Sequence, residues 1–268
     1  MTPSAAAFLE VAAATAQEAG ALIRDRWQGP RQVEKKGFRD LVTDADIAAQ
    51  ALITDRIRTA FPDHGFLAEE EDAALPLDGA VTWLVDPIDG TSNYSRQVPV
   101  FCVSIAAVES GHVVAGVVYD PMRDELFSAR RGAGAWLNKR PVQIAPTPSL
   151  SAAVLALDLS RDPQTRDQLF TWLRTIGHQV HTVRAIGSAA LALAWVGAGR
   201  LDAFVNAGAS PWDIAAGGLI VSEAGGLLTD PAGAPWTPAA PVRGCVAGNA
   251  VCQPPVLATL RAHLGAQR

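Results

Sequence analysis

The segment 83–91, Trp-Leu-Val-Asp-Pro-Ile-Asp-Gly-Thr, constrains the fold more than any other part of this 268-residue chain. An apolar run that ends at Asp-Pro predicts a buried strand that breaks at its C-terminal end. In open α/β sheets, strand ends carry the binding and catalytic side chains. Asp86 and Asp89 can share or flank a hard divalent cation, while Gly90 and Thr91 offer backbone amides and a hydroxyl to an anion. The segment therefore predicts a metal site beside a phosphate site.

Composition indicates a packed soluble α/β protein, because 49% of the residues are apolar and 18% are charged. The length suffices for one large domain or two modest ones. A net charge of −5 argues against nucleic acid as a partner. The three cysteines, Cys102, Cys245 and Cys252, form no CxxC pair, which predicts buried thiols in a reducing, cytoplasmic compartment.

The alanine-rich N-terminus is expected to be an amphipathic helix and not a signal peptide. Glu10, Gln17 and Glu18 interrupt its apolar residues, and no basic region precedes it. No run approaches the ~20 apolar residues of a membrane span, so no membrane association is expected.

The remaining pattern predicts two parts that form one compact catalytic unit. Residues 1–145 are expected to hold the metal-binding turn, an antiparallel meander between residues 101 and 137, and a helix from Thr43 to about Ala60 with Ile47 on its apolar side. Residues 150–268 alternate between strands and helices in α/β rhythm. The predicted strands are 152–157, 179–183 and 201–205, and the predicted helices are 163–176, 188–197 and 211–224.

Two further acidic residues belong with Asp86 and Asp89. Glu69 ends a short strand at 65–68, and Asp213 follows Ser-Pro-Trp at 210–212. Serine before proline is typical of a helix start, which puts Asp213 in the first turn of a helix. Any one of the four could be only a cap or a solvated charge, but the four together favour a metal site.

These segments resemble the motifs of the inositol monophosphatase family. Residues 83–94 resemble its first signature, and residues 212–226, from Trp-Asp-Ile-Ala-Ala-Gly to Glu-Ala-Gly-Gly, resemble its second. Residues 66–70, 40–46 and 187–190 resemble its glutamate motif, the motif before its second helix and its substrate-side turn. The resemblance implies a layered α-β-α-β-α sandwich of the sugar-phosphatase type, a homodimer, and inhibition by lithium.

The resemblance also implies two or three Mg²⁺ ions in each active site. Glu69, Asp86 and the backbone carbonyl of Ile88 would hold the first ion, and Asp86, Asp89 and Asp213 the second. A third, weaker ion would use Glu69 through water. Oxygen ligands suit Mg²⁺, which is hard and keeps several waters that a substrate phosphate can displace.

The implied reaction is direct in-line attack of water on a phosphate monoester, without a phosphoenzyme. Thr91 and Glu69 would orient the water, and Asp46 would polarise the Thr91 hydroxyl. The residues that would contact phosphate or substrate are Asp89, Gly90, Thr91, Ser188, Ala189, Asn206 and Asp213.

The sequence does not distinguish among several possible substrates. Inositol-preferring members place a glutamate at the position of Asn206, whose amide carries no charge. A small polyol or sugar phosphate of the inositol 1-phosphate type is expected, with fructose 1,6-bisphosphate, histidinol phosphate, NADP and phosphoadenosine phosphate as alternatives. A second phosphate would need a basic pocket, for which Arg184 and Arg200 are candidates unless both are surface charges.

Other classes fit less well. Phosphatases with a nucleophilic aspartate use D-x-D-x-T, whereas this chain has D-x-x-D-G-T, and no phosphate-binding P-loop motif occurs. Some members of the family also act as partners of the transcription machinery, so a binding role is carried as the non-enzymatic alternative. All five expected ligand or catalytic positions are filled, which favours catalysis: Glu69, Asp86, Asp89, Thr91 and Asp213.

Overall fold

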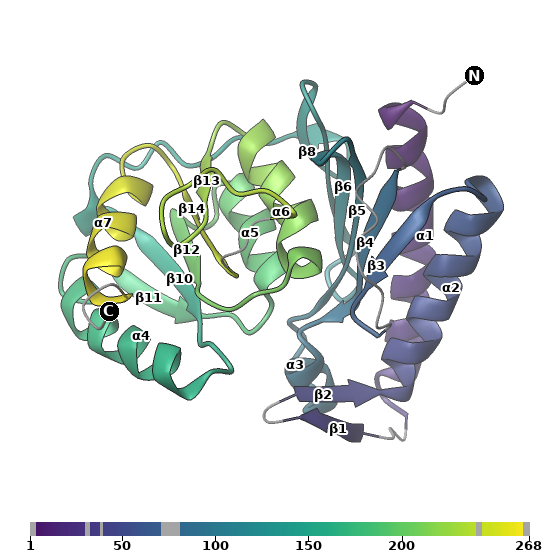
Figure 1. Cartoon of the computed structure of the whole chain (residues 1–268), viewed down its shortest axis with the longest axis horizontal. Coiled ribbons are helices and arrows are strands. Elements are labelled where there is room, and N and C mark those ends of the chain that lie inside the picture. Colours follow the sequence, from purple (N-terminus) through teal and green to yellow (C-terminus); the bar gives the residue numbers. More distant parts are fainter. Residues whose placement is uncertain (1–3, 30–32, 38–39, 71–80, 240–242, 265–268) are drawn as a thin grey trace.

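The chain folds into five layers, shown edge-on in Figure 1. This computed structural model describes residues 4–29, 33–37, 40–70, 81–239 and 243–264. In order, the layers are a helix pair, a seven-stranded sheet, a second helix pair, a five-stranded sheet and a third helix pair. The pairs are α1 (Ala5–Arg26) with α2 (Asp44–Ala60), α5 (Ala189–Gly197) with α6 (Pro211–Glu223), and α4 (Pro163–Ile176) with α7 (Gln253–Leu264). The expected α-β-α-β-α sandwich is thereby confirmed.

The seven-stranded sheet has the order β3-β4-β5-β6-β7-β8-β9. Its first two strands are parallel, and every later neighbour pair is antiparallel, which confirms the predicted meander. The strands are β3 (Gly65–Ala68), β4 (Thr82–Asp89), β5 (Cys102–Glu109), β6 (His112–Asp120), β7 (Glu125–Arg130), β8 (Gly134–Leu137) and β9 (Arg140–Pro141). A separate hairpin of β1 (Val33–Gly37) and β2 (Asp40–Thr43) precedes them, and the short helix α3 (Thr91–Ser95) follows β4.

The five-stranded sheet has the order β11-β10-β12-β14-β13. Its strands are β10 (Val154–Asp158), β11 (Thr182–Ala185), β12 (Ala203–Asn206), β13 (Leu227–Thr229) and β14 (Cys245–Gly248), and a short 3₁₀ turn, η1 (Leu150–Ala152), leads into β10. The predicted alternation of strands and helices is confirmed as far as α6. The sequence pattern gave no prediction for β13 and β14.

Four buried clusters fill the four interfaces between these layers. Trp83 and Leu84 are neighbours on β4, yet they belong to different clusters, because alternate residues of a strand face opposite sides. Trp83 packs with α1 and α2, and Leu84 packs with α5 and α6. Phe204 lies between the central helices and the five-stranded sheet, while Trp172 lies on the far side of that sheet. Burial of both faces explains why residues 83–85 form a continuous apolar run instead of an alternating one.

Helix α1 is long and apolar enough to cross a membrane when judged by length and composition alone. The sequence had predicted no apolar run of that length. Phe8, Ala16 and Ile23 of this helix are fully buried in the cluster that it shares with α2 and the seven-stranded sheet. These contacts are those of a core helix, whose apolar face is already covered by protein.

The predicted inner face of α2 is wrong in one respect. Ile47 was expected on the apolar side, but it is 59% exposed. The face that packs inward carries Asp46, Ala49, Ile53 and Ile57, which recur at helical spacing. Asp46 caps the N-terminus of α2 through Thr43, and turning this carboxylate inward rotates the neighbouring Ile47 out to solvent.

Candidate active site

A β-bulge at the end of β4 brings Asp86 and Asp89 to the same face of the sheet. Asp86 pairs with Ser104 of β5 and Asp89 with Cys102, so three residues of β4 advance against two of β5. Without the extra residue, side chains three positions apart would point to opposite faces. Pro87 sits inside the bulge, where a missing backbone N–H costs no ladder hydrogen bond.

The two carboxylates of β4 have different surroundings. Asp89 accepts hydrogen bonds at Oδ2 from the Ser188 hydroxyl at 2.5 Å and the Ala190 amide at 2.7 Å, which ties it to the start of α5. Asp86 is 2% exposed, and its Oδ1 has no hydrogen-bond partner among the described residues. Burying a carboxylate oxygen without a hydrogen-bond donor is unfavourable in free energy, and a bound cation or a proton would remove this penalty.

The third carboxylate, Asp213, comes from the first turn of α6. Its Oδ2 accepts the Ser210 amide at 2.7 Å in a capping box, as the Ser-Pro start predicts. The Ser104 hydroxyl of β5 donates to the carbonyl of Trp212 at 3.1 Å and fixes this turn against the sheet. Close approach also depends on Gly116 of β6, where a Cβ would lie 2.9 Å from the Cα of Ala216.

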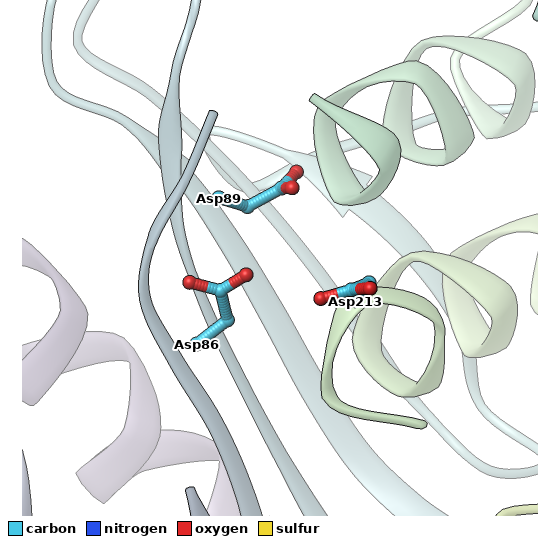
Figure 2. A group of neighbouring side chains, drawn as sticks. All are labelled: Asp86, Asp89 and Asp213. Carbon is cyan, nitrogen blue, oxygen red and sulfur yellow. The ribbon is translucent and has the colours of Figure 1, made fainter. Parts of the chain in front are cut away.

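Asp86, Asp89 and Asp213 thus meet between β4 and the start of α6, as Figure 2 shows. One oxygen from each lies within 4.8 Å of the others. Burial and the charges of its neighbours raise the pKa of Asp86 well above its usual range, and burial with Asp89 raises the pKa of Asp213 to about 7. Two buried carboxylates and a half-buried one, with one oxygen of Asp86 lacking a hydrogen-bond donor among the described residues, form an all-oxygen donor set that fits a hard divalent cation.

Glu69 and Ile88 lie beside this group. Glu69 follows β3, its amide continues the ladder to Val85, and its charge helps to raise the pKa of Asp86. It is not one of the three carboxylates that meet within 4.8 Å, and its Oε1 lies 3.9 Å from Nη2 of Arg161. The carbonyl of Ile88 accepts the Thr91 hydroxyl at 3.0 Å.

Gly90 and Thr91 follow Asp89 directly in the chain, and Asp46 approaches them from α2. Gly90 has φ +102°, and a Cβ there would lie 3.0 Å from the carbonyl of Val100, so only glycine fits. The Thr91 hydroxyl lies 3.2 Å from Oδ1 of Asp46. Burial raises the pKa of Asp46 to about 6, although hydrogen bonds from Thr43 act in the other direction. The structure therefore places the Thr91 hydroxyl within reach of a buried carboxylate.

A pocket of about 700 Å³ opens over these groups and collects residues from both sheets. Ala189 and Asn206 line it, whereas Ser188 is buried and donates its hydroxyl to Asp89. Oδ1 of Asn206 accepts the amides of Gly208 and Ala209, both at 2.8 Å, so this oxygen shapes the loop below the pocket.

The two arginines suggested for a second phosphate do not line this pocket. Arg200 forms a bidentate pair with Glu125 at 2.6 Å. In the part of the chain that the structure describes, Arg184 bonds within its own strand, to Thr182 and the carbonyl of Val183. Both arginines are exposed, in agreement with the alternative that they are surface charges.

Three other arginines line the pocket instead, and the sequence gave no sign of them: Arg161, Arg166 and Arg243. Asn93 was missed as well. Its amide donates to the carbonyls of Val100 and Ile186 at 2.7 and 3.0 Å and holds the 186–187 turn over the site. Asp158 also lines the pocket, accepts the Gly187 amide, and has its pKa raised by burial to about 6. Its place at the end of a predicted strand was the one available signal.

The five layers and the acidic centre between two sheets define a family of phosphatases. A model of the inositol monophosphatase family matches residues 5–265, and the chain belongs to this family. The family is generally metal-dependent, and the Asp86, Asp89 and Asp213 group is where this chain could bind a metal.

Relatives carry two kinds of name. The Nus factor SuhB of Escherichia coli strain K12 is 41% identical over 228 residues, which are 83% of this chain and 85% of that protein. Inositol monophosphatase 1 of Solanum lycopersicum is 40% identical over 232 residues, 84% of this chain and 85% of that protein. The crystal structure of the extragenic suppressor protein suhB of Bartonella henselae superposes with a TM-score of 0.90 at 36% identity, covering 95% and 98% of the two chains.

Proposed function

We propose that this protein is a Mg²⁺-dependent phosphomonoesterase that hydrolyses a small polyol or sugar phosphate. The observation that carries the proposal is the meeting of Asp86, Asp89 and Asp213 within 4.8 Å, with Oδ1 of Asp86 lacking a donor, at a pocket of about 700 Å³. Family membership supports the same class of reaction.

In this proposal Asp86, Asp89 and Asp213 hold the metal, with Glu69 and the carbonyl of Ile88 as further ligands. Two or three Mg²⁺ ions, when bound, supply a lowered pKa for attacking water and neutralise charge on phosphate and leaving oxygen. Magnesium is preferred because all the candidate donors are oxygens and the pocket leaves room for waters and phosphate.

The chain's own groups then bind phosphate and orient water. Gly90 and Thr91 line the pocket at the start of α3, and backbone N–H groups at a helix start attract anions. The Thr91 hydroxyl has one proton and two acceptors within 3.2 Å, the carbonyl of Ile88 and Oδ1 of Asp46. When the hydroxyl donates its hydrogen bond to Asp46, its oxygen lone pairs can accept a hydrogen bond from the attacking water and so orient it.

The substrate side supports a broad polyol or sugar phosphate range more than strict inositol specificity. Oδ1 of Asn206 is already occupied by two amides, so the side chain offers the pocket its amide nitrogen as a donor. Asn206 would hold a substrate hydroxyl through one neutral hydrogen bond, which is weaker than a bond to a charged group.

Phosphate release tests the proposal directly. Purified protein is assayed with Mg²⁺ and with excess EDTA against inositol 1-phosphate, fructose 1,6-bisphosphate, histidinol phosphate, NADP and phosphoadenosine phosphate. Turnover that requires Mg²⁺ and falls with added Li⁺ is expected. Absence of Mg²⁺-dependent release from all five compounds would overturn the phosphatase assignment.

The Nus factor name of a 41% identical relative favours one second candidate, a binding role in transcription. This role does not need the metal centre. It predicts that purified protein binds RNA polymerase or its elongation factors equally well before and after the Asp89→Asn substitution. Failure of pull-down with purified transcription components would remove this candidate.

We further propose a cytoplasmic location, from the buried free cysteines, and a homodimer, as the family resemblance implies. Light scattering of the purified protein at several concentrations gives its mass, and a mass near the monomer value of 28.1 kDa throughout would exclude the dimer.

A further inference from the structure

The carboxylate of Asp89 caps a helix to which it does not belong. Ser188 stands at the N-cap of α5, but its side chain makes no capping bond among the described residues. Its hydroxyl donates instead to Oδ2 of Asp89 at 2.5 Å, and the same oxygen accepts the Ala190 amide, in the first turn of α5, at 2.7 Å. The free amides and the dipole of a helix N-terminus favour such a carboxylate. The orientation of Asp89 therefore depends on where α5 begins.

The turn 186–188, which leads into α5, packs closely on the residues that follow Asp89. Gly187 has φ +74°, and a Cβ there would lie 3.0 Å from Nδ2 of Asn93. A Cβ at Gly90 would lie 3.2 Å from the carbonyl oxygen of Gly187. Two glycines with positive φ thus let this turn approach the end of β4, and only glycine adopts such a conformation without strain.

Two polar side chains hold this turn, one from each side of the pocket. Asn93, in α3 after β4, donates from Nδ2 to the carbonyls of Ile186 and Gly187 at 3.0 and 3.3 Å. Asp158, the last residue of β10 in the other sheet, accepts the Gly187 amide at Oδ1 at 2.7 Å. The carbonyls of the turn are therefore fixed from the metal side, and its amide is fixed from the five-stranded sheet.

Asp158 keeps this bond in an environment that is unfavourable for a carboxylate. Burial and the negative charge of Asp89 raise the pKa of Asp158 to about 6, although hydrogen bonds from the Gly187 and Ile186 amides act in the other direction. A second negative charge beside the acidic centre does not stabilise that centre. The turn needs an acceptor oxygen from this side chain and not its charge.

We propose that Asp158 is a positioning residue of the metal centre, which fixes the turn 186–188 through the Gly187 amide and thereby orients Asp89 toward the cation. The inference rests on the proposed Mg²⁺-dependent function and names a residue outside the metal ligands that controls how tightly the ion binds. Hydrogen-bonding partners that orient metal ligands commonly change metal affinity or activity by about 10- to 100-fold.

Binding of Mg²⁺ in the absence of substrate is the first test, because it does not depend on turnover. The rise of the melting temperature with Mg²⁺ concentration gives the affinity. Asp158→Ala removes the acceptor, so Mg²⁺ should bind at least about 10-fold more weakly. Asp158→Asn removes the charge but keeps an oxygen for the Gly187 amide, and its Mg²⁺ affinity should stay within about threefold of the wild-type value. The pair separates the hydrogen bond from the attraction of a cation by a carboxylate.

Steady-state kinetics separate positioning from contact with substrate. In Asp158→Ala the Mg²⁺ concentration that gives half the maximal rate should rise by about 10-fold, while KM for the phosphate ester at saturating Mg²⁺ should stay within about twofold. A side chain that bound the substrate itself would raise KM instead. Asp167→Ala is the matched control and should change neither quantity, since Asp167 is exposed on α4 and does not line the pocket.

A double substitution tests the route from Asp158 to the metal. Ser188→Ala removes the hydroxyl that bonds Asp89 and should itself weaken Mg²⁺ binding. If Asp158 acts through the turn, Asp158→Ala should cost at most about threefold in this background, compared with about 10-fold in the wild-type protein, because coupled residues are not additive.

The outcomes are distinct. Melting curves in EDTA verify that each variant is folded, and Asp158→Leu, which keeps volume without an acceptor, replaces an unfolded alanine variant. Unfolding of both would assign Asp158 to the stability of the fold and overturn the inference. Equal weakening in the alanine and asparagine variants, unchanged Mg²⁺ binding in both, or independent effects of Asp158 and Ser188 would also overturn it and leave the phosphatase assignment intact. Wild-type protein that neither binds Mg²⁺ nor releases phosphate contradicts the proposed function itself.

Discussion

The two sides of the pocket are built in different ways. The metal side, defined as Asp86, Asp89 and Asp213, consists of buried or half-buried carboxylates fixed by a sheet bulge and a helix cap. The substrate side, defined as Arg161, Arg166, Asn206 and Arg243, lies on loops, the end of β12 and the start of α4, and two of its arginines are exposed.

This difference separates catalysis from selectivity. On the metal side each carboxylate is fixed by backbone register or by hydrogen bonds, so a changed side chain alters the centre itself. On the substrate side Arg161 and Arg243 come from loops, which tolerate exchange better than packed elements. Substitutions on the metal side should therefore change the rate for every substrate, whereas those on the substrate side should change the ranking of substrates.

The largest effect is expected from Asp89→Asn. The asparagine oxygen can accept the bonds from Ser188 and Ala190, so the fold should persist, but the site loses one charge. We expect kcat with Mg²⁺ to fall by at least about 10³-fold for all substrates. Initial rates together with circular dichroism measure this, with Asp167→Asn on the exposed side of α4 as control. Hydrolysis near the wild-type rate would contradict the metal assignment.

A smaller loss is expected from Thr91→Val, which keeps the shape and removes the hydroxyl. Without the bond to Asp46, the attacking water loses its acceptor, and kcat should fall by about 10²-fold with little change in KM. Thr91→Ser retains the hydroxyl and serves as the matched variant. Equal rates for the valine and serine proteins would exclude a role for this hydroxyl.

On the substrate side, Asn206→Glu should raise the preference for inositol 1-phosphate over fructose 1,6-bisphosphate by about 10-fold, since a carboxylate binds ring hydroxyls more strongly. The Asn206→Asp variant adds the same charge and retains the oxygen that accepts the Gly208 and Ala209 amides. Ratios of kcat/KM measure the effect. An unchanged ratio in both variants would remove Asn206 from the specificity of this site.

The smallest effect concerns stability and pH. Burial raises the pKa of Asp213 to about 7 and that of Asp46 to about 6, above the value near 4 of an unfolded aspartate. In metal-free protein the stability present below pH 4 should therefore be lost as pH rises toward 7. Each kcal/mol lowers the melting temperature by about 2–4 °C.

Mg²⁺ should recover this loss, and most strongly near pH 7, because it binds the ionised carboxylates. Melting curves from pH 5 to 8, with Mg²⁺ and with EDTA, test both statements. Metal-free protein that melts at a higher temperature at pH 8 than at pH 5 would contradict the raised pKa values.

Much of the fold could be predicted because its signals are local. The apolar run before Asp86 defined β4, and Ser-Pro before Trp212 defined the start of α6. The α2 helix was predicted as well, but its inner face was wrong at Ile47, because the capping carboxylate of Asp46 sets the rotation. Periodicity alone cannot show which of two adjacent stripes meets the core.

The acidic residues of the site could be identified from the sequence, but their proximity in space could not. Sequence by itself determined four carboxylates at element ends, the glycine turn at Gly90 and the chemistry of oxygen ligands. Only the tertiary structure decided that a bulge turns Asp86 and Asp89 to one face, that Ser104 holds the start of α6 against them, and that Arg161 and not Arg184 faces the pocket. The reason is physical: strands and caps follow from neighbouring residues, whereas register and pocket walls follow from packing between residues far apart in the chain.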